Sequence, residues 1–139
     1  MTSPRLTPAA IRAAHLPDDD ALDPVAWGEV ARRLGRRVSL RFVGKGELEP
    51  AMRAMAEDIS ADVAVSFAGY LSQDELPLEY GRAKVFLFPT SMDCWGVVLN
   101  EACAAGVPCV SSPHTGAAGE MIRDGETGFV CRLDDEAGW

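Results

Sequence analysis

FPTSMDCWGVVLNE, residues Phe88–Glu101, joins a buried strand to a helix through a short polar loop. The strand expected at Val85–Pro89 is apolar on both faces, which is typical of a central strand in a parallel sheet. A loop over Thr90–Cys94 leads to a helix expected from about Trp95 to Ala105. Gly106 ends that helix, because glycine accepts the left-handed conformation that follows many helices. A strand, a short loop and a helix in this order predict an α/β fold.

The same alternation extends along the chain on both sides of this segment. Further strands are expected at Val38–Val43, Val63–Ala68, Cys109–Ser112 and Gly128–Cys131. Further helices are expected from Asp23-Pro24 to Gly35, from about Pro50 to Ile59, and near Gly119–Arg123. A short helix is also expected after Ser72, which would cap it, and Pro77 is expected to limit its length. We therefore expect an irregular segment over residues 1–23 and one Rossmann-like domain over 24–139, a parallel sheet flanked by helices. Ligands of such sheets bind at the carboxyl ends of the strands.

Composition and charge exclude several classes of protein. The chain has 139 residues, and its net charge of −8 argues against a nucleic-acid partner. No apolar run is long enough to span a membrane, and the first residues lack the apolar core of a signal peptide. We therefore expect a cytoplasmic location, either free or peripheral to the inner face of the membrane. The four cysteines show no zinc-binding spacing, so they are expected to be reduced and buried.

Two acidic residues carry the chemistry of the opening segment. Asp93 lies in the loop after the strand, and Glu101 lies in the following helix with seven residues between them. Free amides and the positive end of the helix dipole can hold a diphosphate there, and Gly96 lets a ligand approach the backbone. Asp93 and Glu101 would then bind hydroxyl groups at the two ends of the ligand. The structural alternative is that Asp93 caps the helix and Glu101 is solvated, and the residues alone leave both interpretations open.

The segments FLFPTSMDCWGVVLNEACAAGVPCVSS and GAAGEMIRDGETGFV resemble the C-terminal domain of family-4 glycosyltransferases. These enzymes have the GT-B fold, in which two Rossmann-like domains face a cleft. Their hallmark is two acids with seven residues between them, followed by small residues and G-x-P, and Asp93, Glu101 and Ala104–Pro108 match it. Asp93 stands where the family usually has glutamate. The resemblance implies retaining, metal-independent transfer from a nucleoside diphosphate sugar, with no cofactor.

The resemblance also implies a role for each matching position. The residues expected to bind the donor sugar are Asp93 and the amides of Cys94, Trp95 and Gly96. The residues expected to bind the nucleotide are Glu101 at the ribose, the amides of Val97 and Val98 at the phosphate, Gly44 and Gly46 in a glycine turn, and Tyr70 and Leu71 beside the base. No protein nucleophile and no metal ligand is expected. Three residues also have structural alternatives: Trp95 would pack in the core, Tyr70 would lie at the surface and Lys45 would be solvated. For His114, the absence of a functional role is the favoured interpretation.

Two parts of the family pattern are missing from the chain. The basic loop that neutralises the diphosphate has no match, and the N-terminal acceptor domain is absent. The chain therefore looks like a truncated C-terminal half, expected to need a missing domain or partner subunit and to self-associate through exposed apolar surface. The main alternative to a glycosyltransferase domain is a non-catalytic nucleotide-binding fragment or a module of a split enzyme. A nucleotide-sugar epimerase on the same fold is not supported, because the sequence shows no His or Asp constellation of that kind.

Overall fold

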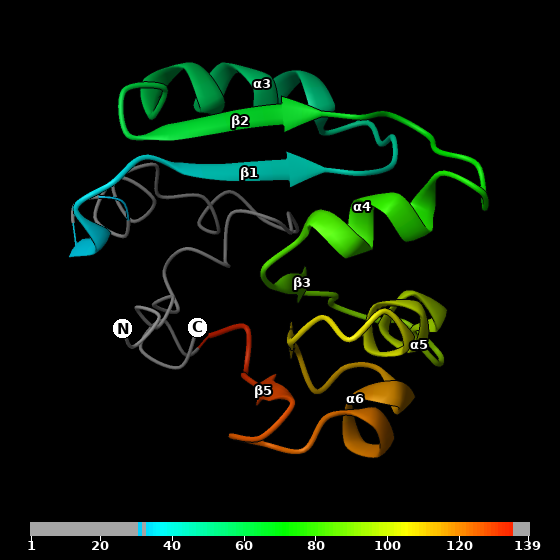
Figure 1. Cartoon of the computed structure of the whole chain (residues 1–139). Helices are drawn as coiled ribbons and strands as arrows, with labels where there is room; N and C mark the ends of the chain where they lie inside the picture. Colours follow the sequence, from blue (N-terminus) through cyan, green and yellow to red (C-terminus); the bar gives the residue numbers. More distant parts are fainter. Residues whose placement is uncertain (1–30, 32, 135–139) are drawn as a thin grey trace. The chain divides into compact units, whose positions relative to one another are not determined.

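The computed structural model describes residue 31 and residues 33–134, and it divides the chain into two compact units (Figure 1). The first unit is Met1–Leu71 and the second is Ser72–Trp139. No helix within the described residues is long and apolar enough to cross a membrane. The expected irregular segment over 1–23 and the helix start at Asp23-Pro24 lie outside the described residues.

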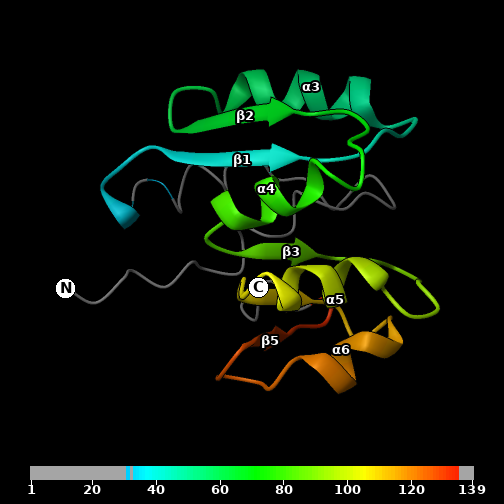
Figure 2. The ribbon, with the colours of Figure 1, turned by 45° about the vertical axis from the view of Figure 1, so that its right-hand side comes forward.

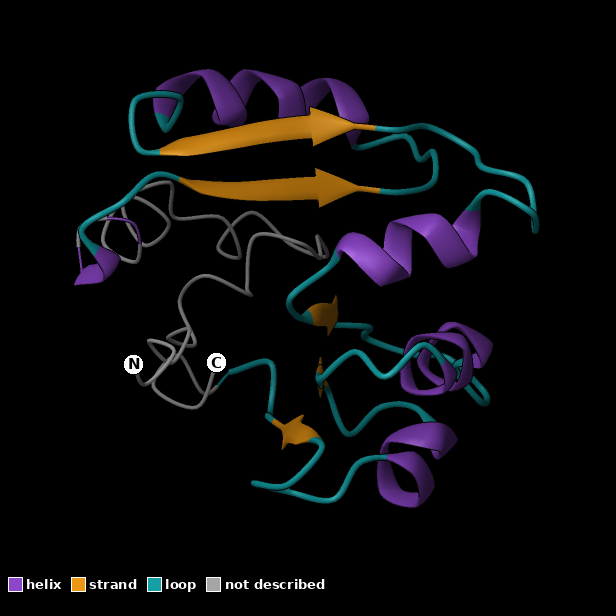
Figure 3. Cartoon of the chain, viewed as in Figure 1, coloured by secondary structure: helices purple, strands orange, loops and turns teal. Residues whose placement is uncertain are grey.

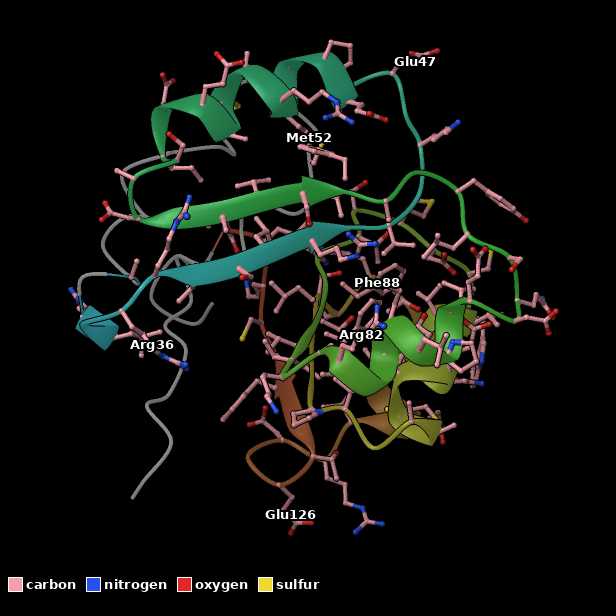
Figure 4. All side chains as sticks on the ribbon, turned by 45° about the horizontal axis from the view of Figure 1, so that its top comes forward. Arg36, Glu47, Met52, Arg82, Phe88 and Glu126 are labelled. Atoms are coloured by element: carbon pink, nitrogen blue, oxygen red, sulfur yellow. The ribbon has the colours of Figure 1, made fainter. Side chains whose placement is uncertain are left out.

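In the described part of the first unit, two parallel strands are joined by a helix. β1 (Val38–Phe42) pairs with β2 (Val63–Phe67) in register from Val38 opposite Val63 to Phe42 opposite Phe67. At the carboxyl end the rings of Phe42 and Phe67 stack with their centroids 5.0 Å apart. α3 (Glu49–Asp58) connects the strands and runs along β2 in both ribbon views (Figures 1 and 2). Met52 of α3 lies between the helix and the strands in Figure 4, so this face of the helix covers the sheet.

The second unit holds a three-stranded parallel sheet with helices α4, α5 and α6 (Figure 3). The strands are β3 (Phe86–Phe88), β4 (Cys109–Ser111) and β5 (Gly128–Val130), with β4 in the middle. The helices are α4 (Leu76–Arg82), α5 (Val97–Ala104) and α6 (Gly116–Met121). A core between helices and sheet is formed by Tyr80, Leu99, Ala102, Val107, Cys109, Ala117, Ala118 and Ile122. Both units therefore have the parallel strand–helix organisation that the sequence predicts.

Three helix starts differ from the sequence-based expectation. The helix expected from Ser72 begins at Leu76, because the Glu75 carboxylate accepts hydrogen bonds from the Ser72 amide and hydroxyl, both at 2.8 Å. Pro77 consequently lies in the first turn of α4 and does not limit it. The helix expected from Trp95 begins two residues later, at Val97.

The third difference concerns α6, which was expected near Gly119–Arg123 but spans Gly116–Met121. Its early start follows from a tertiary contact, since the Ala117 amide donates to the Trp95 carbonyl at 2.8 Å. The ends at Gly35 and Gly106 agree with the prediction, because both glycines have positive φ, 60° and 72°. The strands agree with the prediction to within a residue or two at each end.

Candidate functional site

The loop before α5 is organised by Asp93. Its Oδ1 accepts hydrogen bonds from the Trp95 amide at 3.0 Å and from the Gly96 amide at 2.6 Å. Asp93 therefore stabilises the loop that precedes the helix, while the N-cap residue itself is Gly96. Two of the three amides expected at the donor sugar are thus bound by Asp93 in this structure. The other carboxylate oxygen, Oδ2, has no hydrogen-bond partner among the described residues.

The loop that contains His114 and Thr115 is hydrogen-bonded to the Asp93 loop. The Trp95 carbonyl accepts hydrogen bonds from the Thr115 hydroxyl at 2.5 Å and from the Ala117 amide at 2.8 Å. The Asp93 amide donates to the His114 carbonyl at 3.0 Å. His114 therefore acts here through its backbone. Thr115 is a positioning residue, and no motif in the sequence points to it. The segments 93–96 and 114–117 form one hydrogen-bonded pair of loops, which we call the paired loops.

Glycines allow the paired loops to approach each other this closely. Gly96 has φ 83°, and a Cβ atom there would overlap the Thr115 hydroxyl oxygen and come within 3.2 Å of the Phe88 ring. Phe88 itself lies on β3 and is labelled in Figure 4. A Cβ on Gly116 would lie 3.0 Å from the Trp95 ring, so the indole packs against the backbone there. Trp95 is nevertheless 42% exposed, which leaves part of the ring available to a ligand.

Glu101 lies one turn further along α5 and is held by Tyr80 of α4. The Tyr80 hydroxyl donates to Glu101 Oε2 at 3.0 Å and lies 3.4 Å from the Val98 carbonyl oxygen. Tyr80 is buried, and burial raises the pKa of its hydroxyl, with a further increase from the Glu101 carboxylate. The Tyr80 hydroxyl therefore stays protonated at neutral pH and remains a hydrogen-bond donor to Glu101. No sequence motif singles out Tyr80, but its spacing from Leu76 and Ala83 indicates a buried helix face, on which a tyrosine hydroxyl needs a hydrogen-bond partner.

The remaining predicted site residues belong to two places. Val97 and Val98 open α5, and within the described residues no hydrogen bond engages their amides. Cys94 is exposed in the paired loops, next to Asp93. Gly44, Gly46, Tyr70 and Leu71 lie in the first unit, at the loops that follow β1 and β2. The two groups are in separate units, and each is placed at the carboxyl end of parallel strands.

Other candidate side chains supply no additional centre. Glu120 is an exposed residue of α6, and its side chain takes part in no hydrogen bond among the described residues. The part of the chain that the structure describes contains no cluster of three or more His, Cys, Asp or Glu side chains able to hold a metal ion. Cys109 is buried, and its desolvation raises the pKa of the thiol to about 12. Its thiol lies 3.8 Å from that of Cys103, which is half-buried.

Parallel strands, helix-covered faces and polar loops at the strand ends define a Rossmann-like ligand-binding architecture. The comparison with known families narrows this class. The model of the glycosyl transferases group 1 family matches residues 25–137, and the chain belongs to that family. The fold is that of the C-terminal domain of a GT-B glycosyltransferase.

Individual relatives agree with this assignment. The chain is 35% identical over 106 residues to a GDP-mannose-dependent alpha-(1-6)-phosphatidylinositol monomannoside mannosyltransferase of Mycobacterium tuberculosis, with 71% of the chain and 27% of the relative covered. It is 33% identical over 116 residues to a glycogen synthase of the same species, with 84% and 28% covered. The crystal structure of Anabaena HepE with UDP and glucose superposes with a TM-score of 0.60 at 19% identity, covering 70% of this chain and 27% of that one.

This chain covers only a part of each relative, which limits what the similarities show. The chain spans 27% and 28% of the length of the two mycobacterial enzymes. The sequence likeness assigns the family, and the likeness to HepE assigns the fold. The donor, the acceptor and the reaction of this chain therefore rest on the geometry of its own residues.

Proposed function

We propose that the chain binds a nucleoside diphosphate sugar and serves as the donor-binding domain of a retaining, metal-independent glycosyltransferase. The observation that carries the proposal is the beginning of α5, where the Val97 and Val98 amides are unoccupied and the helix dipole is positive. Two amides that point out of a helix start can bind a phosphate without a metal ion. The mannosyltransferase is GDP-mannose-dependent by its name, and the HepE crystal structure contains UDP and glucose, which supports a ligand of this class here.

The ribose end of the donor is assigned to Glu101. Tyr80 occupies one carboxylate oxygen, Oε2, whereas Oε1 has no hydrogen-bond partner among the described residues. An ionised carboxylate whose orientation is fixed by a buried tyrosine can accept hydrogen bonds from two vicinal hydroxyls. Glu101 lies one turn beyond the amides of Val97 and Val98, which is the order that ribose and phosphate have in a nucleotide.

The sugar end is assigned to Asp93 and the paired loops. Asp93 Oδ2 has no hydrogen-bond partner within the described residues, and Trp95 is 42% exposed. Hydroxyl groups of the sugar would donate to Oδ2, and its apolar face would lie against the indole. No protein nucleophile is assigned, so the donor phosphate itself is proposed to act as the base. The acceptor is proposed to be bound by a further domain or subunit in the cytoplasm.

Calorimetric titration of the 139-residue chain tests the proposal. UDP, GDP and ADP are titrated with and without attached glucose or mannose, against the wild type and three variants. Glu101→Ala is expected to weaken every nucleotide at least about tenfold, since it removes a charged partner of the ribose. Asp93→Asn is expected to weaken only the sugar-bearing ligands. Glu120→Ala, an exposed acid of the same unit, is the matched control and is expected to change nothing.

The outcomes separate the proposal from its parts. A folded chain that binds none of the nucleotides at millimolar concentration contradicts the proposal. Binding that survives Glu101→Ala removes the ribose assignment, and a sugar-dependent gain that survives Asp93→Asn removes the sugar assignment.

A second candidate function is a nucleotide-binding module without transfer activity. It is favoured by the hydrogen bonds of Asp93 to its own loop, because they occupy two amides that a donor sugar would otherwise use. This candidate predicts equal affinities for UDP and UDP-glucose, and for GDP and GDP-mannose. A gain in affinity from the sugar contradicts it.

A further inference from the structure

Two cysteines of the second unit lie close together where α5 ends and β4 begins. Cys103 is in the last turn of α5, and Cys109 is the first residue of β4. Their sulfur atoms are 3.8 Å apart. An S–S bond is about 2.0 Å long, so the sulfurs need to approach by about 1.8 Å, and rotation of one side chain about its Cα–Cβ bond can supply this movement.

The turn between the helix and the strand fixes this arrangement through its backbone. The Gly106 amide donates to the Cys103 carbonyl at 2.9 Å, and the Val107 amide donates to the Ala102 carbonyl at 3.0 Å. With φ 72° at Gly106, these two bonds form the Schellman motif that sets the path of a chain leaving a helix. Cys109 is held at the other end, because β4 is the middle strand of its sheet. The two thiols are therefore neighbours by construction of the fold.

The two thiols differ in their access to solvent. Cys103 is half-buried, whereas Cys109 is completely buried. Burial, and then the neighbouring Cys103 sulfur, raise the pKa of the Cys109 thiol to about 12. The thiolate is the form that attacks an oxidant, so Cys103 reacts first and Cys109 keeps its proton. Cys94 is exposed, but no other thiol of the described residues lies within hydrogen-bonding distance of its sulfur.

We propose that Cys103 and Cys109 form a dithiol site that reacts with hydrogen peroxide and closes to a disulfide. In the first step the Cys103 sulfur attacks one peroxide oxygen, the O–O bond breaks, and the departing hydroxide takes up the thiol proton as water. Cys103 is then a sulfenic acid. In the second step the Cys109 sulfur attacks the Cys103 sulfur, the S–O bond breaks, and the hydroxide leaves with the Cys109 proton as a second water. The two sulfurs together lose two electrons, which the peroxide gains.

The disulfide ties the last turn of α5 to β4. It closes a ring over residues 103–109, at the opposite end of α5 from the Val97 and Val98 amides. Thiol reductants reverse it by exchange, which makes the modification a reversible one. Because the reaction uses neither those amides nor the two acids, the inference does not rest on the proposed function.

The test follows the two thiols by mass spectrometry of the whole chain after peroxide treatment. The treated chain is denatured, alkylated with iodoacetamide and cleaved after glutamate. Cleavage after Glu101 and Glu120 releases residues 102–120, which contain Cys103 and Cys109 and no other cysteine. This peptide should be two hydrogens lighter than its dithiol form and should take up no iodoacetamide. After reduction with dithiothreitol, both of its thiols should be alkylated.

Three variants test the roles of the individual cysteines. Cys94→Ser removes the exposed thiol and keeps the pair, so residues 102–120 should lose two hydrogens as in the wild type. Cys109→Ser leaves the Cys103 sulfenic acid without a thiol to attack it, so dimedone should capture this sulfenic acid. Cys103→Ser should leave Cys109 as a free thiol under the same treatment, because Cys109 is buried and protonated.

The central readout uses the wild-type chain, so it does not depend on the folding of any variant. The inference is overturned if residues 102–120 keep two alkylatable thiols while peroxide oxidises Cys94. It is also overturned if the disulfide joins Cys94 to either thiol of the pair or joins two chains. Dimedone capture at Cys109 in Cys103→Ser, as strong as that at Cys103 in Cys109→Ser, contradicts the order of the two steps.

Discussion

The two acids of the second unit are held in different ways. Asp93 is bound by the backbone amides of its own loop, two and three residues away, at 3.0 and 2.6 Å. Glu101 is bound by the hydroxyl of Tyr80, twenty-one residues away on another helix, at 3.0 Å. Removing the Asp93 carboxylate therefore disturbs a local fold, whereas removing the Tyr80 hydroxyl frees the Glu101 side chain. In the proposed site, the first acid would couple ligand binding to loop structure, and the second would couple it to the packing of α4 against α5.

The largest effect is expected where the Asp93 loop meets its neighbour, at Gly96. Gly96→Ala adds a Cβ that overlaps the Thr115 hydroxyl at a residue with φ 83°. The free energy of unfolding should fall by about 2–5 kcal/mol, from backbone strain and overpacking together. Gly106→Ala is the control, because φ is 72° there but the space is open, and it should cost about 1 kcal/mol. Urea unfolding measures both, and equal losses would contradict the role of the paired loops.

The next effect concerns the Asp93 carboxylate itself. Asp93→Ala leaves the Trp95 and Gly96 amides without their acceptor and should lower the free energy of unfolding by about 1–2 kcal/mol. Asp93→Asn retains an acceptor oxygen and should recover at least half of that loss. Thermal or urea unfolding measures the difference between the variants. If alanine and asparagine are equally stable, the hydrogen bonds to the loop do not hold it.

A smaller effect is expected at the Glu101 end of the comparison. Tyr80→Phe removes the hydroxyl but keeps the buried ring, so the free energy of unfolding should fall by about 1 kcal/mol. Nucleotide affinity should fall several-fold because Glu101 loses the donor that orients it, and the effect should be the same with and without a sugar. Calorimetry measures this loss. A loss confined to sugar-bearing ligands would assign Tyr80 to the wrong end of the site.

The smallest effect appears only at alkaline pH. The folded pKa of Tyr80 is raised above its ordinary value of 10.0, so the unfolded chain releases this proton first. Its contribution to stability is complete below pH 10 and is lost as the pH rises further. Cys109 adds a similar loss from its ordinary value of 9.0 toward about 12. The free energy of unfolding of Tyr80→Phe should therefore fall less steeply above pH 10 than that of the wild type, since Cys109 contributes equally to both. If the two plots of unfolding free energy against pH are parallel, the raised pKa of Tyr80 is contradicted.

The sequence predicts the parts of this structure that depend on local composition. Strands such as Val63–Phe67 are apolar runs bounded by turn residues. Gly35 and Gly106 end their helices as expected. The resemblance carried by Asp93, Glu101 and the following small residues identifies the family correctly. These features need no knowledge of what lies across the fold.

The helix starts and the partners of the site residues depend on contacts that a single stretch of sequence does not show. The Trp95 carbonyl accepts a hydrogen bond from the Ala117 amide, twenty-two residues further along the chain, which advances α6. The contact of Tyr80 with Glu101 joins two helices. Each of these is a choice between competing hydrogen-bond partners, and the choice is made by the tertiary structure.

The paired loops also set a rule for redesign of this domain. Trp95 offers its carbonyl to Thr115 and Ala117, and His114 offers its own to Asp93, so neither loop has a conformation independent of the other. An insertion or deletion in one of them moves the acceptors that the other requires. Residues 93–96 and 114–117 therefore form one structural unit, and a graft that replaces one segment should replace the other with it.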